Sequence, residues 1–203
     1  MCRRPNIFFR LWLWLKRFRH RCGYGIHSPF AFNLTTQVIY QRGEFYAYAP
    51  LKAGRAGAHL AEKDDRLLLR LANDWQPKTC LLVGAQTDVS ARYVRAGCLG
   101  CTVVRAASLE ELPAEDDALP EMLVIDADDF GPAALARLCP ALRRARRCLL
   151  VALRIGENTK MAAEWQNFSQ ENGDSAIIFD LYYLGLAYFG TGLAPQSYTI
   201  NYV

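Results

Sequence analysis

The sequence predicts an α/β fold with an open, mostly parallel sheet that helices cover on both faces. Two observations lead to this prediction. Short apolar runs of strand length alternate with segments of helical periodicity along most of the chain. Those runs are almost wholly apolar, as in strands that are buried on both faces. A chain of 203 residues, 52% of them hydrophobic, is long enough for one domain with a sizeable core.

The clearest strand and helix pair lies in residues 78–97, KTCLLVGAQTDVSARYVRAG. We expect a buried strand at Thr79–Val83, a tight turn that opens at Gly84, and a helix over Asp88–Ala96. The aspartate at the start of this helix is expected to cap it, and Gly97 suits its C-terminal end. A strand that leads into a helix through a glycine turn begins a nucleotide-binding βαβ unit, in which the helix N-terminus faces the ligand.

The remaining elements continue this alternation and end in a closing pair of strands. Further helices are expected at 62–75, 132–147 and 158–170, and further strands at 101–106, 121–126, 148–153, 175–181 and 197–203, with one more around 185–189 that merges with the strand before it.

Positive charge is concentrated at the N-terminus. Eight of the 24 basic residues precede Glu44, the first acidic residue, so the rest of the chain has 16 basic against 20 acidic residues and a net charge of −4. The basic character therefore belongs to an N-terminal arm, residues 1–43, and the α/β domain is expected to occupy 44–203.

The arm begins with an apolar segment at 7–18 that carries Arg10 in its middle and is followed by a basic run. This segment is too short to span a bilayer and lacks the cleavage site of a signal peptide. Two interpretations remain open: a helix that docks on the domain, or an interfacial helix with aromatic rings among lipid headgroups and residues 3–21 supplying positive charge. We expect docking through one apolar stripe, with the remaining aromatic surface left for a membrane or a protein partner. The stripe consists of Ile7, Leu11, Leu15 and Phe18.

A second helix start follows in the arm at Ser28-Pro29, with serine as the N-cap and proline in the first turn. His27 precedes this cap. It is a candidate general base, although a single histidine beside a helix cap more often has a structural role.

The seven cysteines show neither the spacing nor the even number of a disulfide framework. Cys98 and Cys101 form a CxxC motif without a second pair, and we interpret it as a turn rather than a metal or redox site. A reducing cytoplasm is therefore the expected compartment, and the arm would bring the protein to the inner face of the membrane.

The ordered set of motifs resembles the class I S-adenosylmethionine (SAM)-dependent methyltransferases, in particular their O-methyltransferase-like branch. The resemblance covers about residues 23–203. It rests on GIHSPFAFNL, the FYAY loop, the helix RLLLRLANDWQPKT, the LLVGAQTDVS turn, the strand end VIDADDF and the closing FDLYYLGLAYFGTGLAPQSYTINYV. It implies a Rossmann-like sheet with a C-terminal antiparallel hairpin, formed by Phe179–Phe189 with Ser197–Val203.

The resemblance also implies where the cofactor would bind. It places the cofactor-binding site on Gly84, Ala85, Asp88, Arg105 and Asp126. In the family's first loop, acidic-x-Gly-x-x-x-Gly, only Gly84 is kept: Leu82 stands at the acidic position and Asp88 at the second glycine. The acidic residue that binds the ribose after the second strand is replaced by Arg105, which would suit a phosphate or a carboxylate instead.

Two further departures concern the sheet edge and a metal. Only fourteen residues, Ala107–Pro120, lie where the family fits a helix, a strand and a helix, so we expect one edge strand to be missing. Relatives that act on catechols hold Mg²⁺ with an aspartate at the position of Asp126 and an Asp-Asn pair after the next strand. That pair reads Leu153-Arg154 here. Because Mg²⁺ requires oxygen ligands, no metal is expected.

Two functions remain open, and the sequence does not decide whether the chain is an enzyme. One is a methyltransferase for an unknown small molecule, with SAM bound weakly or not at all. The other is a pseudo-methyltransferase, a binding module that uses the arm. No catalytic residue stands out, although methyl transfer requires little beyond positioning. Nucleic acid is not an expected partner, because only the arm and the arginines at 143–147 would favour it.

Overall fold

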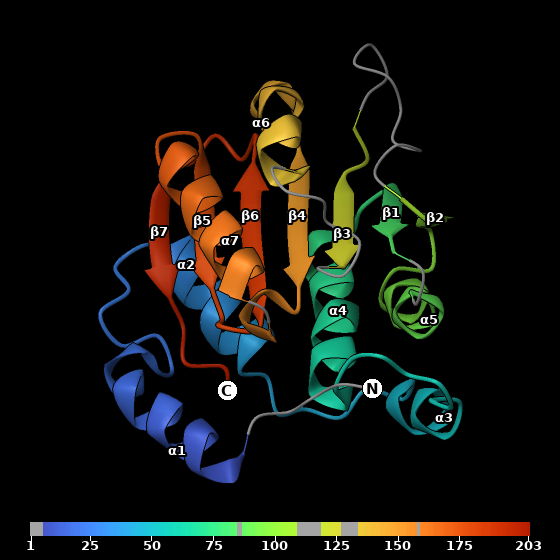
Figure 1. Cartoon of the computed structure of the whole chain (residues 1–203). Coiled ribbons are helices and arrows are strands. Elements are labelled where there is room, and N and C mark those ends of the chain that lie inside the picture. Colours follow the sequence, from blue (N-terminus) through green and yellow to red (C-terminus); the bar gives the residue numbers. More distant parts are fainter. Residues whose placement is uncertain (1–5, 85–86, 109–118, 127–133, 158) are drawn as a thin grey trace.

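The computed structural model describes residues 6–84, 87–108, 119–126, 134–157 and 159–203. It contains one open sheet between two layers of helices (Figure 1). Helix α4 (Glu62–Trp75) and the second half of the arm cover one face, and α6 (Ala134–Arg144) and α7 (Thr159–Glu171) cover the other. The expected α/β fold is confirmed.

Seven strands form the sheet in the order β2-β1-β3-β4-β6-β5-β7. They are β1 (Thr79–Val83), β2 (Thr102–Ala106), β3 (Met122–Asp126), β4 (Cys148–Leu153), β5 (Ala176–Asp180), β6 (Leu184–Phe189) and β7 (Gln196–Thr199). The first four strands are parallel to one another, and β6 is antiparallel to its neighbours β4 and β5. The first four strands lie within one residue of their expected bounds, since each is a compact apolar run.

The pairing at the C-terminal end differs from the expected one. The antiparallel hairpin is formed by β5 and β6, whereas β7 adds to the outer side of β5 as a parallel strand. A tight turn separates β5 from β6: the Asp180 side chain accepts the N–H of Tyr182 at 2.7 Å, and Tyr182 has a left-handed φ of 74°. The expected merged strand over 179–189 is therefore wrong, because this turn reverses the chain in its middle.

Strand β2 is the outermost described strand on its side of the sheet. The expectation of a missing strand between β2 and β3 concerns Ala107–Pro120, and most of that segment, residues 109–118, lies outside the described part of the chain. The described ends of the segment, 107–108 and 119–120, are not in a strand.

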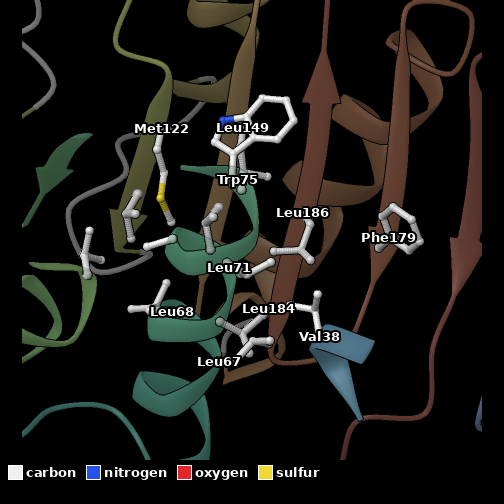
Figure 2. Packing of buried hydrophobic residues seen from close by; sticks show 14 of the residues in the cluster. Val38, Leu67, Leu68, Leu71, Trp75, Met122, Leu149, Phe179, Leu184 and Leu186 are labelled. Atoms are coloured by element: carbon white, nitrogen blue, oxygen red, sulfur yellow. The ribbon is translucent and has the colours of Figure 1, made fainter. Parts of the chain in front are cut away.

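Alternate residues of the strands enter two separate cores, as the two-residue period of a strand requires. In β1, Leu82 faces the core under α4, and Leu81 and Val83 face the core under α6 and α7. Figure 2 shows Leu67, Leu68, Leu71 and Trp75 of α4 lying against the sheet in the first of these cores. Each central strand is thus buried on both faces, which explains its continuous apolar sequence.

Helix α5 (Asp88–Gly97) packs beside α4 at a point where only glycine fits. A Cβ built on Gly97 would lie 2.2 Å from the backbone oxygen of Leu69. Gly97 therefore ends α5, as expected, and also lets the two helix backbones approach each other.

The second half of the arm belongs to the first core. Helix α2 (Pro29–Asn33) begins at the expected N-cap, where the Ser28 hydroxyl accepts the N–H of Ala31. A π-helix over Leu34–Ile39 continues it, and Leu34, Val38 and Ile39 are buried against the sheet.

Helix α1 (Ile7–Lys16), the first half of the arm, docks in an unexpected orientation. Its one buried side chain is Leu13, whereas the stripe that we expected to dock is exposed: Ile7 by 74%, Leu11 by 56%, Leu15 by 58% and Phe18 by 39%. None of the described helices combines the length and the hydrophobicity needed to cross a bilayer.

Candidate functional site

The turn after β1 provides the backbone of the candidate site. Gly84 has a φ of 135°, a conformation that favours glycine, and its N–H donates to the Ala106 carbonyl at 2.9 Å. The buried Thr87 hydroxyl donates to the Gly84 carbonyl at 3.1 Å and so closes the turn. Ala85, which the resemblance places at the cofactor, lies outside the described residues.

Asp88 does not cap α5, contrary to our expectation. Thr87 is the N-cap residue, and Asp88 is the first residue within the helix. The Asp88 carboxylate instead forms an ion pair with Arg105 at the end of β2. This is possible because β1 and β2 are parallel neighbours. The start of α5 and the end of β2 therefore lie at the same end of the sheet, where both strands finish. Asp88 is 72% exposed and Arg105 is 44% exposed, so the pair is solvated.

The third altered position, Leu82, does not face this edge. Its side chain is fully buried in the core under α4. A carboxylate at this position would be surrounded by apolar side chains, which would make its burial costly.

A second group of polar side chains lies where β3 and β4 end. We call it the carboxyl-edge cluster, and it consists of His59, Asp126, Arg154 and Glu157. Arg154 donates through both Nε, at 2.7 Å, and Nη2 to Oδ1 of Asp126. Its Nη1 lies 3.6 Å from the Glu157 carboxylate. Asp126 and Arg154 are almost completely buried, and such buried charges persist only when they are paired.

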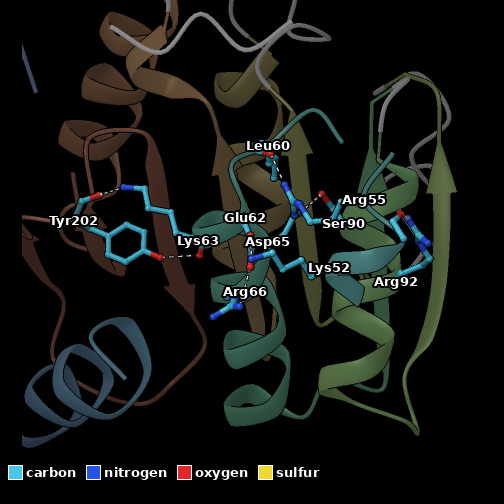
Figure 3. Close-up of polar contacts among 11 residues, drawn as sticks. Lys52, Arg55, Leu60, Glu62, Lys63, Asp65, Arg66, Ser90, Arg92 and Tyr202 are labelled. Atoms are coloured by element: carbon cyan, nitrogen blue, oxygen red, sulfur yellow. Dashed lines mark hydrogen bonds and ion pairs between the residues drawn. The ribbon is translucent and has the colours of Figure 1, made fainter. Parts of the chain in front are cut away.

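His59 reaches the cluster from the loop that precedes α4. Its Nε2 lies 4.0 Å from Oδ2 of Asp126, and its side chain is 8% exposed. The loop is fixed by Arg55, which pairs with the buried carboxylate of Asp65 and donates to the Leu60 carbonyl at 2.6 Å (Figure 3). Burial raises the pKa of the Asp65 carboxyl, while hydrogen bonds from Ser90 and Arg55 oppose this shift.

The cluster does not fit a metal ion. One oxygen of Asp126 already accepts two N–H groups of Arg154, whose guanidinium supplies positive charge beside that carboxylate. Within the described ranges, no three His, Cys, Asp or Glu side chains are grouped to hold a metal. Arg154 follows β4 at the position that the resemblance assigns to part of a metal-binding pair, so a cationic side chain stands where the relatives supply a ligand.

The remaining candidates do not join these groups. His27 is exposed where α2 begins. Cys98 and Cys101 flank the turn before β2 as free thiols, and burial raises the pKa of Cys101 to about 11. Of the arginines at 143–147, Arg143 donates to the Asn172 side chain and Arg147 pairs with Glu121, so both serve internal packing.

The structure thus separates the sequence-derived candidates into two places. Gly84, Asp88 and Arg105 gather at the ends of β1 and β2, whereas Asp126 belongs to the carboxyl-edge cluster. A ligand in an open parallel sheet binds at the carboxyl ends of the strands, where successive connections leave in opposite directions. In this chain that point lies between β1 and β3. Gly84 directly follows β1, and Asp126 is the last residue of β3.

Comparison with known proteins identifies the fold through shape alone. No protein-family model matches the chain, and no curated protein matches its sequence. A methyltransferase from Geobacter sulfurreducens is similar with a TM-score of 0.52 and 16% identity, over 72% of this chain and 92% of that one. An O-methyltransferase from Bacillus cereus, solved in complex with SAH, gives a TM-score of 0.50 and 12% identity, over 73% of this chain and 92% of that one. The fold is that of the class I O-methyltransferases.

Two ion pairs lie at the carboxyl ends of the strands in this fold. The ion pair of Asp88 with Arg105 lies beside the turn after β1, and the ion pair of Asp126 with Arg154 lies beyond β3. The four charged side chains at these strand ends therefore already form two ion pairs. The resemblance implies that glycines and acidic acceptors hold SAM. The residues of this chain at those positions do not match that pattern.

Proposed function

We propose that this chain is a SAM-dependent methyltransferase-like protein in which SAM binding is weakened or lost. Its fold, and the SAH complex of the similar Bacillus cereus protein, support SAM as the ancestral ligand of the site. The observation that carries the proposal is the ion pair between Asp88 and Arg105.

This ion pair opposes SAM binding at two parts of the ligand, its carboxylate and its ribose. SAM carries a carboxylate that a helix N-terminus would attract, and Asp88 places a negative charge in the first turn of α5. The ribose hydroxyls donate to an acidic acceptor in the family, whereas the Arg105 guanidinium has donors only. A ligand would also have to compete with the existing pair.

Calorimetric titration with SAM and SAH tests the proposal. The unaltered protein is expected to bind neither at micromolar concentration. Asp88→Gly should strengthen binding because it removes the negative charge at the helix start, and Asp88→Gly/Arg105→Glu should strengthen it further because the acceptor returns. The control Arg137→Glu makes the same charge change as Arg105→Glu, but on the exposed surface of α6, and should have no effect. Micromolar binding by the unaltered protein would contradict the proposal.

A second candidate function is a non-catalytic binding module that acts through the arm, on a membrane surface or a protein partner. The exposed apolar side chains of α1 favour it, because a helix that served only to pack on the domain would bury them. The two functions are compatible, since α1 and the Asp88–Arg105 pair share no residue.

A further inference from the structure

Helix α1 is held to the domain by polar contacts and one buried side chain, and most of its apolar side chains take no part in the docking. Arg17, which follows α1, donates to the Asp180 carboxylate at 2.9 Å and to the Ile200 carbonyl at 3.3 Å. Asn201 donates through Nδ2 to the Trp14 carbonyl at 3.0 Å. Together with the buried Leu13, these contacts turn the opposite side of the helix toward solvent.

The solvent-facing side is strongly apolar. Ten of the fourteen exposed large hydrophobic side chains in the described residues lie between Ile7 and Phe32. They are Ile7, Phe8, Phe9, Leu11, Trp12, Trp14, Leu15, Phe18, Tyr24 and Phe32. Isolated exposed hydrophobic residues are ordinary, but so many on one segment mark a contact surface.

Exposed positive charges border the same surface. Lys16 lies 5.2 Å from the ring centre of Trp12, and Arg21 lies 3.8 Å from that of Phe18. Arg19 and Arg21 line an open hollow of about 960 Å³ that continues this surface past the end of α1. The sequence contains no acidic residue before Glu44, so nothing in the arm repels a negatively charged partner.

This inference deepens the second candidate function by naming the partner. We propose that α1 is an interfacial helix that binds an anionic lipid bilayer. Tryptophan and phenylalanine among lysine and arginine, on a helix that lies flat, match the headgroup region of a bilayer. The ten residues of α1 extend about 15 Å, half the hydrocarbon thickness of about 30 Å, so the helix lies in the surface rather than across it.

The charge distribution selects a lipid surface over a second copy of this chain. A symmetric dimer through α1 would place Lys16, Arg19 and Arg21 against the arm of the other copy, which carries basic residues and no acidic one, and like charges oppose such an interface. An anionic bilayer attracts these residues instead. The rest of the chain has a net charge of −4. The electrostatic field of an anionic bilayer would therefore repel the rest of the chain and orient the basic arm toward the bilayer.

Co-sedimentation of the full chain with vesicles tests the proposal. Binding is expected to vesicles of equal phosphatidylcholine and phosphatidylglycerol, to fall steeply with salt, and to be much weaker with phosphatidylcholine alone. Lys16→Gln/Arg19→Gln/Arg21→Gln should weaken binding by about fivefold per residue. Leu11→Ser/Leu15→Ser should abolish it, whereas Leu99→Ser/Val104→Ser, at exposed apolar residues outside the arm, should leave it unchanged.

Three results would overturn the proposal: no sedimentation with either vesicle, equal sedimentation with both, or a dimer that Leu11→Ser/Leu15→Ser converts to a monomer. All substituted side chains are exposed, so urea unfolding should be unaltered. The outcome does not depend on SAM binding, so a failure here and a failure of the calorimetric test remain distinguishable.

Discussion

Arg154 carries a buried positive charge at the end of β4, and two carboxylates flank it. Asp126 accepts two of its N–H groups, and Glu157 lies 3.6 Å away. A buried charge is costly unless it is paired. Removal of one partner therefore destabilises the protein because it leaves the other charge buried and unpaired. The carboxyl-edge cluster is therefore a structural unit, whatever ligand approaches it.

Substitution of Arg154 tests this interpretation. Arg154→Met is expected to lower the free energy of unfolding by about 3–5 kcal/mol, because it leaves the buried Asp126 carboxylate without its cation. Urea unfolding measures this loss. Asp126→Asn/Arg154→Met should recover a large part of it, since neither charge then remains. The exposed Arg137→Met is the control. If the double variant were as unstable as the single one, lost packing rather than lost pairing would explain the result.

The pairing of Asp126 with Arg154 was available in the sequence. Asp126 ends one buried strand and Arg154 follows the next, and the carboxyl ends of adjacent parallel strands lie side by side. His59 gave no such signal, because the loop that carries it is placed by the tertiary contacts of Arg55. The role of Asp88 was mistaken because its partner, Arg105, competes with the backbone for its carboxylate.

At the scale of elements, the contact between α4 and α5 depends on a close approach of two backbones. Gly97 faces the Leu69 carbonyl across this contact, and no larger residue fits without displacing backbone atoms. Because α5 leads from the turn after β1, its position also sets the geometry of the candidate site.

Gly97→Ala should therefore destabilise the protein, although alanine normally favours a helix. We expect a loss of about 1–3 kcal/mol in the free energy of unfolding, because the added methyl group forces α4 and α5 apart. Thermal or urea unfolding measures it. Gly100→Ala is the matched control, since its Cβ would meet no atom within 4 Å. Equal stability of the two variants would show that the helices separate without cost.

Elements with a strong pattern were predictable, and those defined by a turn or a distant partner were not. The central strands are continuous apolar runs, and α4 matches its expected bounds. The reversal at Tyr182 has no glycine or proline as a turn signal, so the sequence predicts one strand where the structure has β5 and β6. The orientation of α1 depends on Arg17 and Asp180, which are 163 residues apart in the sequence.

At the scale of the whole molecule, stability should decrease from the centre of the sheet to its edges. Strands β3, β4 and β6 are buried at every residue, whereas β2 and β7 are largely exposed or half-buried. Amides buried between two cores exchange only through large openings, and edge amides exchange through small ones.

Hydrogen exchange followed by mass spectrometry checks this gradient. Peptides from β3, β4 and β6 should exchange most slowly and those from β2 and β7 much faster, with α1 among the fastest segments, because one buried side chain and a few polar contacts hold it. Protection of β2 equal to that of β3 would indicate that another element covers this edge in solution.

The docking of α1 on Asp180, Ile200 and Asn201 also places this helix late in the order of folding. Asp180 ends β5, and the other two residues follow β7, which pairs with β5. Their positions are therefore set only when these two strands have joined the sheet. Contacts between residues so far apart in the sequence also carry a large cost of loop closure. We therefore expect α1 to dock after the sheet has formed, so that a bilayer or a chaperone can meet its aromatic and basic side chains before the helix is held.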